Sequence, residues 1–189
     1  MKIIAGTARG VELTIPEGMD IRPTSVRARK ALFDSLGDMS DMSVLDLCAG
    51  SGAIGFEAAS RGASQVTMVE ISQVHIGYIS ENQRKIAATG VDSAIMILNF
   101  DVLDAEKYLP RMPAKPDLIF ADPPYGKSAE IFCALANNEY FCRTLSGSRI
   151  IWEIPDTPGA AGNFLNIPSF GKYSLRKLGG TLFFSGVFK

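Results

Sequence analysis

The apolar positions of this chain fall into short runs that alternate with amphipathic stretches through its centre. Runs bounded by turn signals predict strands, and apolar residues spaced three to four apart predict helices. Strands are expected at 44–48, 65–70, 93–98, 117–121 and 148–154, and helices at 52–62, 72–88, near 102–109 and at 127–138. This alternation of strand and helix predicts a parallel sheet with helices on both faces.

The two ends of the chain follow other patterns. Residues 3–16 hold two short apolar runs around a Gly/Arg turn, which predicts a hairpin. A helix capped by Thr24 or Ser25 should follow and end at Gly37. Residues 172–188 form two strand-like runs around a Gly-Gly pair, a second hairpin signal. The expected fold is therefore α/β, with a mostly parallel seven-stranded sheet that closes with an antiparallel hairpin.

The composition is that of an ordinary globular protein, with 47% apolar and 21% charged residues. No apolar run approaches the roughly 18–20 residues of a membrane span, and the start lacks the pattern of a secretory signal, so a cytoplasmic protein is expected. Cys48, Cys133 and Cys142 are widely spaced and match neither a disulfide framework nor a zinc motif. The single histidine, His75, is interpreted as a surface residue, and no metal site is expected.

Charge is distributed unevenly around a net value of −1. Residues 1–35 hold six Lys/Arg against four Asp/Glu, residues 36–141 seven against fourteen, and residues 142–189 six against two. Basic ends therefore surround an acidic middle. Two interpretations are open: a solvated surface, or an anionic partner such as nucleic acid that the ends would reach.

A glycine-rich loop follows the first strand of the predicted parallel sheet. Gly50, Gly52 and Gly55 satisfy G-x-G-x-x-G, and Glu70 ends the next strand. Glycines let the backbone turn tightly and approach a ligand, and an acidic side chain at the second strand can accept hydrogen bonds from ribose hydroxyls. The pattern alone allows a dinucleotide, S-adenosylmethionine, or a βα turn that binds nothing.

Two further carboxylates favour S-adenosylmethionine. Asp46, inside the first strand, suits a cationic ammonium better than a pyrophosphate, and Asp101, at the end of the third strand, can accept from an adenine amino group. The loop resembles motif I of the S-adenosylmethionine-dependent methyltransferases. With the next motif, that resemblance implies a cofactor site made of Asp46, Cys48, Ala49, Gly50, Ser51, Gly52, Glu70, Asp101, Val102 and Asp122.

The segment Asp122-Pro123-Pro124-Tyr125 follows the fourth predicted strand. The Asp122 carboxylate and the Pro123 carbonyl can accept the two N–H groups of a nucleobase amine, and Tyr125 can stack on the base. The alternative is a turn that only ends the strand. The segment resembles motif IV, D/N-P-P-Y/F/W, of the amino-group methyltransferases, which implies that these four residues are catalytic.

Nearly the whole chain resembles the bacterial 16S ribosomal RNA guanine-N2 methyltransferases. The matching patterns are IIAG-x-x-RG from Ile3, RPT-x-x-x-R-x-x-LF from Arg22, and DLCAGSGAIGFEAASRGA from Asp46. Cys48, where the family commonly has Phe, and the closing KLGGTLFF depart from the pattern. The resemblance implies a Rossmann-like class I fold in a single domain, with residues 1–40 as an N-terminal extension and 41–189 as the catalytic core.

The resemblance also implies the reaction. S-adenosylmethionine would be the cofactor, and the substrate would be the exocyclic N2 amine of one guanine in 16S rRNA, presented by a small ribosomal subunit particle. A monomer without metal is expected. The candidate RNA contacts are Arg9 in the first turn, Arg22 and Thr24 at a helix start that favours anions, and Lys127 beyond the Asp-Pro-Pro-Tyr segment.

Three other functions stay open at this point. One is a related enzyme that methylates another nucleobase amine, such as DNA adenine, although the chain leaves little room for a separate target-recognition region. Another is a non-catalytic RNA-binding protein that holds S-adenosylmethionine. The third is a nicotinamide oxidoreductase, which would leave both Asp46 and the segment from Asp122 unexplained.

Overall fold

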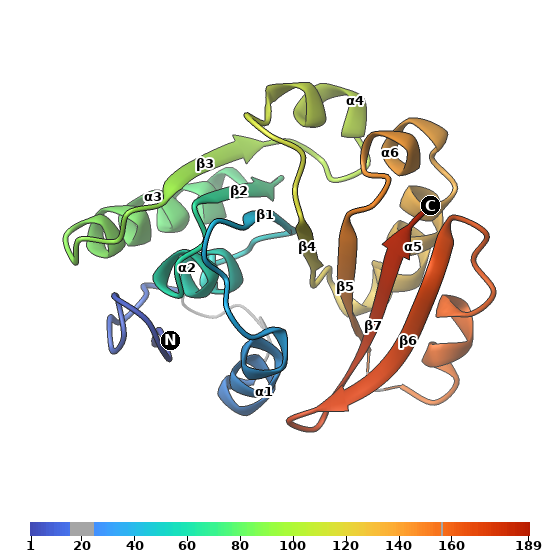
Figure 1. Cartoon of the computed structure of the whole chain (residues 1–189), viewed down its shortest axis with the longest axis horizontal. Coiled ribbons are helices and arrows are strands. Elements are labelled where there is room, and N and C mark those ends of the chain that lie inside the picture. Colours follow the sequence, from blue (N-terminus) through green and yellow to red (C-terminus); the bar gives the residue numbers. More distant parts are fainter. Residues whose placement is uncertain (16–24, 156) are drawn as a thin grey trace.

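Seven strands form one sheet in the order β3-β2-β1-β4-β5-β7-β6 (Figure 1) in the computed structural model, which describes residues 1–15, 25–155 and 157–189. Strands β1 to β5 run parallel, β7 is antiparallel to β5, and β6 is antiparallel to β7. The strands are β1 (Ser43–Leu47), β2 (Gln65–Glu70), β3 (Ala94–Asn99), β4 (Leu118–Ala121), β5 (Arg149–Ile154), β6 (Phe170–Leu178) and β7 (Thr181–Phe188). The predicted seven-stranded sheet with its antiparallel closing hairpin is confirmed.

Helices cover both faces of this sheet and divide its core in two. The first core contains side chains of α1 (Val26–Leu36), α2 (Ala53–Ser60) and α3 (Gln73–Ala87). The second contains side chains of α4 (Ala105–Tyr108), α5 (Ser128–Ala136) and α6 (Glu139–Thr144). Because successive side chains of a strand point to opposite faces, Val44 packs into the first core and Leu45 into the second. Strands buried on both faces explain the continuous apolar runs of the sequence.

The strand order reverses between β1 and β4. From β1 the chain continues outward through β2 to β3, and it then returns to place β4 and β5 on the other side of β1. Ligands of open α/β sheets bind outside the carboxyl ends of the strands at such a switch point. The glycine loop after β1 and the Asp-Pro-Pro-Tyr segment after β4 both lie there.

Helix boundaries agree with the sequence in part. Ser25 caps α1 by accepting a hydrogen bond from the Ala28 N–H at 3.1 Å, and Gly37 ends the helix at φ 79°. The helix expected at 127–138 is confirmed as α5, which ends at Ala136, whereas the next helix, α6, begins after Asn138 and was not predicted. The side chain of Asn138 accepts from the Phe141 N–H at 2.8 Å and so starts the new helix.

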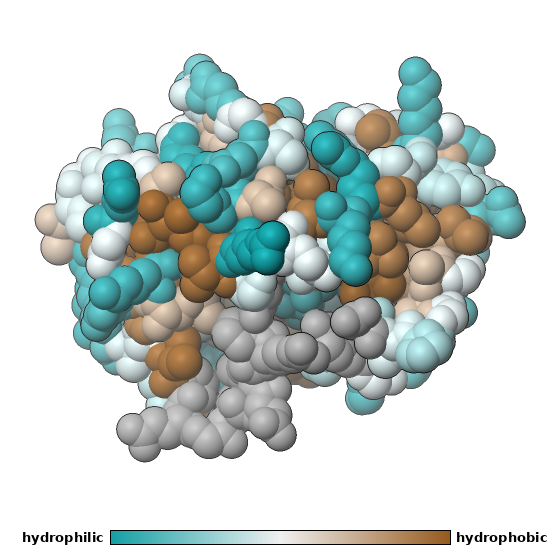
Figure 2. All heavy atoms as spheres, turned by 90° about the horizontal axis from the view of Figure 1, so that it is seen from below, coloured by the Kyte–Doolittle hydropathy of each residue, from teal (hydrophilic) through white to brown (hydrophobic). Residues whose placement is uncertain are grey.

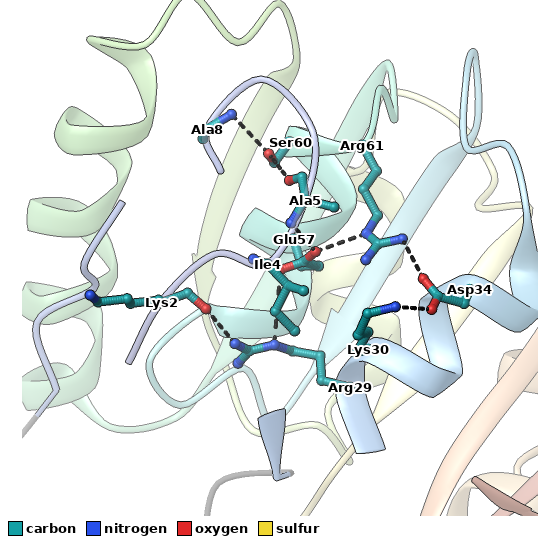
Figure 3. Close-up of polar contacts among 10 residues, drawn as sticks. All are labelled: Lys2, Ile4, Ala5, Ala8, Arg29, Lys30, Asp34, Glu57, Ser60 and Arg61. Carbon is teal, nitrogen blue, oxygen red and sulfur yellow. Dashed lines mark hydrogen bonds and ion pairs between the residues drawn. The ribbon is translucent and has the colours of Figure 1, made fainter. Parts of the chain in front are cut away.

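The two arms of the expected N-terminal hairpin pair through the bridge of Lys2 with Glu12 and through backbone hydrogen bonds such as that from the Ile3 N–H to the Val11 carbonyl at 3.0 Å. Other backbone groups of this segment bond to side chains of α2 (Figure 3). The Ile4 N–H donates to Glu57 at 2.8 Å, and the Ala8 N–H donates to the Ser60 hydroxyl at 2.9 Å. The segment is therefore held by the helix that follows the glycine loop.

Candidate active site

The glycine loop between β1 and α2 turns through residues in the left-handed region. Cys48 has φ 58°, Gly50 φ 57° and Gly52 φ 77°. The Gly52 N–H donates to the Ala49 carbonyl at 2.7 Å, and α2 begins at the next residue. A Cβ on Gly52 would lie 2.5 Å from the Phe56 ring, so backbone conformation and close packing both require glycine here.

The third glycine of the pattern serves the packing of α2 on β2. A Cβ on Gly55 would lie 2.4 Å from the end of Met68 and 3.0 Å from Val66. The Gly55 N–H donates to the Asp46 carboxylate at 2.9 Å, which ties the first turn of α2 to β1. Asp46 is only 3% exposed, and its burial raises its pKa to about 7, assisted by the charge of Glu70 and opposed by the Gly55 hydrogen bond.

Glu70 ends β2 and holds the loop from the other side. Its Oε2 accepts from the Gly50 N–H at 2.8 Å, and its Oε1 accepts from the Ser72 N–H at 2.9 Å. A carboxylate offers about four lone-pair sites, so it can still accept from ligand hydroxyls. His75 Nδ1 lies 3.4 Å from Glu70 Oε1, and the histidine side chain is 16% exposed. His75 is thus half-buried beside the loop, which corrects the interpretation as a surface residue.

Asp101 lies two residues beyond the last residue of β3, Asn99, and not at the end of the strand as expected. Its Oδ1 accepts from the Leu103 N–H at 2.9 Å and so shapes the turn toward α4. Val102 packs into the second core, and its carbonyl accepts the Tyr108 hydroxyl at 3.1 Å. The turn that carries Asp101 is therefore fixed by side chains on both sides.

The carboxylates expected at the site gather around Cys48. Burial raises the pKa of the Cys48 thiol, and the charges of Glu70, Asp46, Asp122 and Asp101 raise it further. Since charges act appreciably only over short distances in a screened medium, the four carboxylates occupy one neighbourhood. Asp46, Glu70, Asp101 and Asp122 belong to or follow the four neighbouring strands β1 to β4, and all four act on this thiol.

The Asp-Pro-Pro-Tyr segment leaves the sheet directly after β4. Ala121 is the last residue of β4, and it pairs with Leu47 of β1 and with Trp152 of β5. Pro123 is buried, whereas Pro124 is exposed and its carbonyl accepts from the Lys127 N–H at 2.9 Å. Tyr125 begins the short 3-10 helix Tyr125–Lys127. Its side chain lies outside the described part of the structure.

A small hollow, partly open to solvent, lies against this segment. Asp46, Asp122 and Glu153 line it, together with apolar side chains of α1, α2, β4, β5 and β7. Glu153 was not predicted as a site residue. Its signal in the sequence is a carboxylate within the apolar run of β5, and the strand register was needed to place it.

The candidate RNA contacts are described only in part. Arg9 and Lys127 are exposed, and the Arg9 N–H donates to the Gly6 carbonyl at 3.1 Å within the first turn. Arg22 and Thr24 lie outside the described residues. Figure 2 views the protein from the end at which β4 and β5 finish, and hydrophilic side chains stand among apolar ones on this face.

Two classes of feature are absent from the described residues. Within 1–15, 25–155 and 157–189, no three His, Cys, Asp or Glu side chains are grouped as metal ligands would be. None of the helices assigned in these ranges combines the length and the apolar character that crossing a bilayer requires.

Comparison with known proteins identifies the family. The model of the family described as Conserved hypothetical protein 95 matches residues 1–156. The chain is 32% identical over 126 residues to the ribosomal RNA small subunit methyltransferase D of Escherichia coli strain K12, a match that covers 66% of this chain and only 60% of that protein.

Solved structures give the same fold. A hypothetical protein of Thermus thermophilus is similar with a TM-score of 0.71 and 29% identity, over 100% of this chain and 99% of the other. The precorrin-6y C5,15-methyltransferase of Geobacter metallireducens has a TM-score of 0.63 at 17% identity, covering 94% of each chain, and so shows the fold alone. The fold is that of the class I methyltransferases, and the chain belongs to the family described as Conserved hypothetical protein 95.

Proposed function

We propose that this chain transfers the methyl group of S-adenosylmethionine to the exocyclic N2 amine of a guanine in 16S rRNA. The observation that carries the proposal is the set of carboxylates at the glycine loop, which lies at the switch point of the sheet. Glu70 accepts from the Gly50 N–H, Asp46 accepts from the Gly55 N–H, and Asp122 lines a hollow together with Asp46. The relative from Escherichia coli, a small-subunit rRNA methyltransferase by name, supports the reaction class.

The residues present fit the cofactor chemically. A Cβ on Gly50 would meet nothing closer than the Cys48 carbonyl oxygen at 3.9 Å, so the backbone is open to a ligand at that point. Asp46, Glu70 and Asp101 would hold its ammonium, its ribose hydroxyls and its adenine amino group. S-adenosylmethionine, when bound, supplies an electrophilic methyl group on a positively charged sulfur. Four carboxylates complement such a cation and repel a pyrophosphate, which disfavours nicotinamide dinucleotides.

Asp122 and Pro123 would position the substrate amine. The lone pair of an exocyclic amine is delocalised into the base, so its direction matters more than prior removal of a proton. Acceptors for both N–H groups, the Asp122 carboxylate and the Pro123 carbonyl, favour a pyramidal nitrogen whose lone pair can be aimed. The amine loses one proton after the N–C bond has formed. Positioning and charge stabilisation of this kind account for large rate factors.

The proposed RNA substrate would contact the protein through exposed cations and an aromatic ring. Arg9 and Lys127 are exposed cations that can contact phosphates, and Tyr125 is assigned by the sequence to stack on the target base. A small-subunit particle, whose shape is already built, is the proposed substrate.

Methyl-labelled S-adenosylmethionine tests the proposal directly. The protein is offered naked 16S rRNA, small-subunit particles that lack the modification, and duplex DNA, and the products are digested to nucleosides and identified by mass. The Asp122→Ala variant serves as the control for contaminating activity. N2-methylguanosine from RNA or particles is expected. N6-methyladenosine, a DNA product or no transfer would contradict the proposed reaction.

A further inference from the structure

Glu153 is a buried carboxylate on β5, a strand whose four apolar side chains serve the core. Trp152 and Ile154 of β5 pack into the second core, and Ile151 packs into the first. Glu153 lies two residues after Ile151, so it faces the same side of the sheet, and it is 4% exposed. Burying a carboxylate costs free energy that an apolar residue would avoid. The carboxylate at this position borders the hollow beside Asp122.

The strand register places Glu153 beside Asp122. Ala121 pairs with Trp152 across β4 and β5, so Asp122 and Glu153 are the next residues along the two neighbouring strands. Asp46 faces the same side, because it pairs with Phe120 and Phe120 pairs with Ile151. The two carboxylates beyond the β4–β5 ladder accordingly line the same hollow as Asp46.

A second hydrogen-bond acceptor next to Asp122 would distinguish guanine from the other bases that carry an exocyclic amine. In guanine the exocyclic N2 amine is adjacent to the ring N1–H, which is a donor. In adenine and cytosine the ring nitrogen beside the amine on the Watson–Crick edge carries a lone pair instead. An ionised carboxylate is an acceptor only, so it pairs with the ring N–H of guanine and opposes the lone pair of the other two bases.

We propose that Glu153 is the specificity residue of this site and accepts the N1–H of the target guanine while Asp122 and the Pro123 carbonyl accept from its N2 amine. The inference rests on the proposed function and adds the means by which guanine is distinguished from the other amine-bearing bases. A site built to hydrogen-bond a donor discriminates strongly against an analogue that lacks it, because a buried acceptor is then left unpaired.

The test uses 2-aminopurine, which keeps the C2 amine but carries a lone pair at N1. Small-subunit particles are reconstituted with ligated 16S rRNA that has either guanine or 2-aminopurine at the methylated position. The wild-type protein should show kcat/KM lower by about a hundredfold or more for 2-aminopurine. In Glu153→Gln the side-chain amide can donate or accept, so the ratio should fall below about tenfold, with slower transfer to guanine.

A matched control and two binding measurements complete the design. Glu139→Gln changes an exposed glutamate of α6 and should keep the wild-type ratio. Calorimetry should show unchanged S-adenosylmethionine affinity for Glu153→Gln, and thermal unfolding reports whether this variant is folded. A loss of rate that is equal for both bases would assign Glu153 a structural role and overturn the proposal.

The comparison of guanine with 2-aminopurine uses the wild-type protein alone. It therefore tests discrimination between the two bases even if Glu153→Gln fails to fold. Normal guanine methylation with no discrimination against 2-aminopurine overturns the role of Glu153 alone. No N2-methylguanosine from the wild-type protein on guanine-containing particles overturns the proposed function itself, and the two failures are thereby distinguished.

Discussion

Arg29 and Glu57 form an ion pair closed off from solvent: Arg29 Nε lies 3.9 Å from Glu57 Oε2, and the side chains are 1% and 0% exposed. The same carboxylate accepts the Ile4 N–H at 2.8 Å, the Ala5 N–H at 3.1 Å and Arg61 Nε at 2.8 Å (Figure 3). Glu57 belongs to α2, the helix that begins at the glycine loop. One buried carboxylate therefore joins the N-terminal segment and α1 to the helix of the proposed cofactor site.

Replacing this carboxylate should destabilise the fold. Burial lowers the pKa of Arg29 and the charge of Glu57 opposes that change, so Glu57→Gln leaves a buried guanidinium without its counter-charge. The expected loss is about 3–5 kcal/mol in the free energy of unfolding, measured by urea denaturation. Asp34→Asn removes an exposed partner of Lys30 and should change stability little. Equal effects of the two substitutions would show that Glu57 does not hold these elements together.

Gly52 should not tolerate a side chain. Alanine there must adopt φ 77° and place its Cβ 2.5 Å from the Phe56 ring. Strain and overpacking of this kind each cost about 1–3 kcal/mol, and Gly52→Ala should also weaken S-adenosylmethionine binding because the loop must shift. Gly77→Ala is the control, since Gly77 lies in α3 with open space around its Cβ position. That change should stabilise the helix by about 0.5–1 kcal/mol. Unfolding and calorimetric titration measure both effects.

Asp122→Ala should separate turnover from cofactor binding. Loss of the acceptor for the substrate amine should lower kcat by about 10²–10³-fold, the range found when one preorganised hydrogen-bonding group is removed from an active site. S-adenosylmethionine affinity should fall much less, because Asp46, Glu70 and Asp101 are unchanged. Single-turnover methylation and calorimetry give the two quantities. Unchanged turnover would rule out the assigned role of Asp122.

Asp46 should make stability fall as the pH rises. Its pKa is raised to about 7 by burial, so the folded protein binds a proton that the unfolded chain releases near its ordinary pKa of 3.8. The stabilising contribution is full below that ordinary value and is lost between it and pH 7. Asp46→Asn removes this titration, so its stability relative to wild type should increase between pH 4 and 8 by up to about 4 kcal/mol.

A second aspartate, Asp38, provides a control because its effect on stability should change with pH in the opposite direction. Hydrogen bonds from Ser40, the backbone N–H foremost, lower the pKa of Asp38, so its contribution is present above its ordinary pKa and is lost as the pH falls. The stability of Asp38→Asn relative to wild type should therefore decrease as the pH rises. Urea denaturation across the same pH series measures both variants. A difference for Asp46→Asn that is constant with pH would contradict the buried, protonated carboxyl.

Most of the sheet could be predicted because its buried strands appear in the sequence as continuous apolar runs. Parallel strands buried on both faces need continuous apolar runs, and the runs at 44–48 and 65–70 contain β1 and β2 almost to the residue. The glycine loop was predictable for a related reason, since the conformation of Gly52 and the packing at Gly55 each exclude other residues. Local chemistry determines these features, so a single sequence displays them.

The rest depends on contacts between distant segments. The arms of the N-terminal hairpin pair as the alternation predicts, but further N–H groups of this segment bond to Glu57 and Ser60 of α2, which lie more than fifty residues away. Glu153 entered the candidate site only through the register of β5 against β4. The break between α5 and α6 depends on whether the side chain of Asn138 caps a new helix or continues the old one, and composition does not decide that.

Arg9 and Lys127 should contribute to RNA binding through phosphates. The double variant Arg9→Gln/Lys127→Gln should raise KM for small-subunit particles and reduce the slope of log affinity against log salt by about 1–2, because each phosphate contact releases close to one counterion. Lys115→Gln is the matched control. Lys115 is exposed and lies before β4, at the amino end of the strand and away from the proposed site. Filter binding at several salt concentrations, with unchanged S-adenosylmethionine affinity, would show that RNA contacts the surfaces that carry Arg9 and Lys127. Equal slopes for the double variant and for Lys115→Gln would place the RNA elsewhere on the protein.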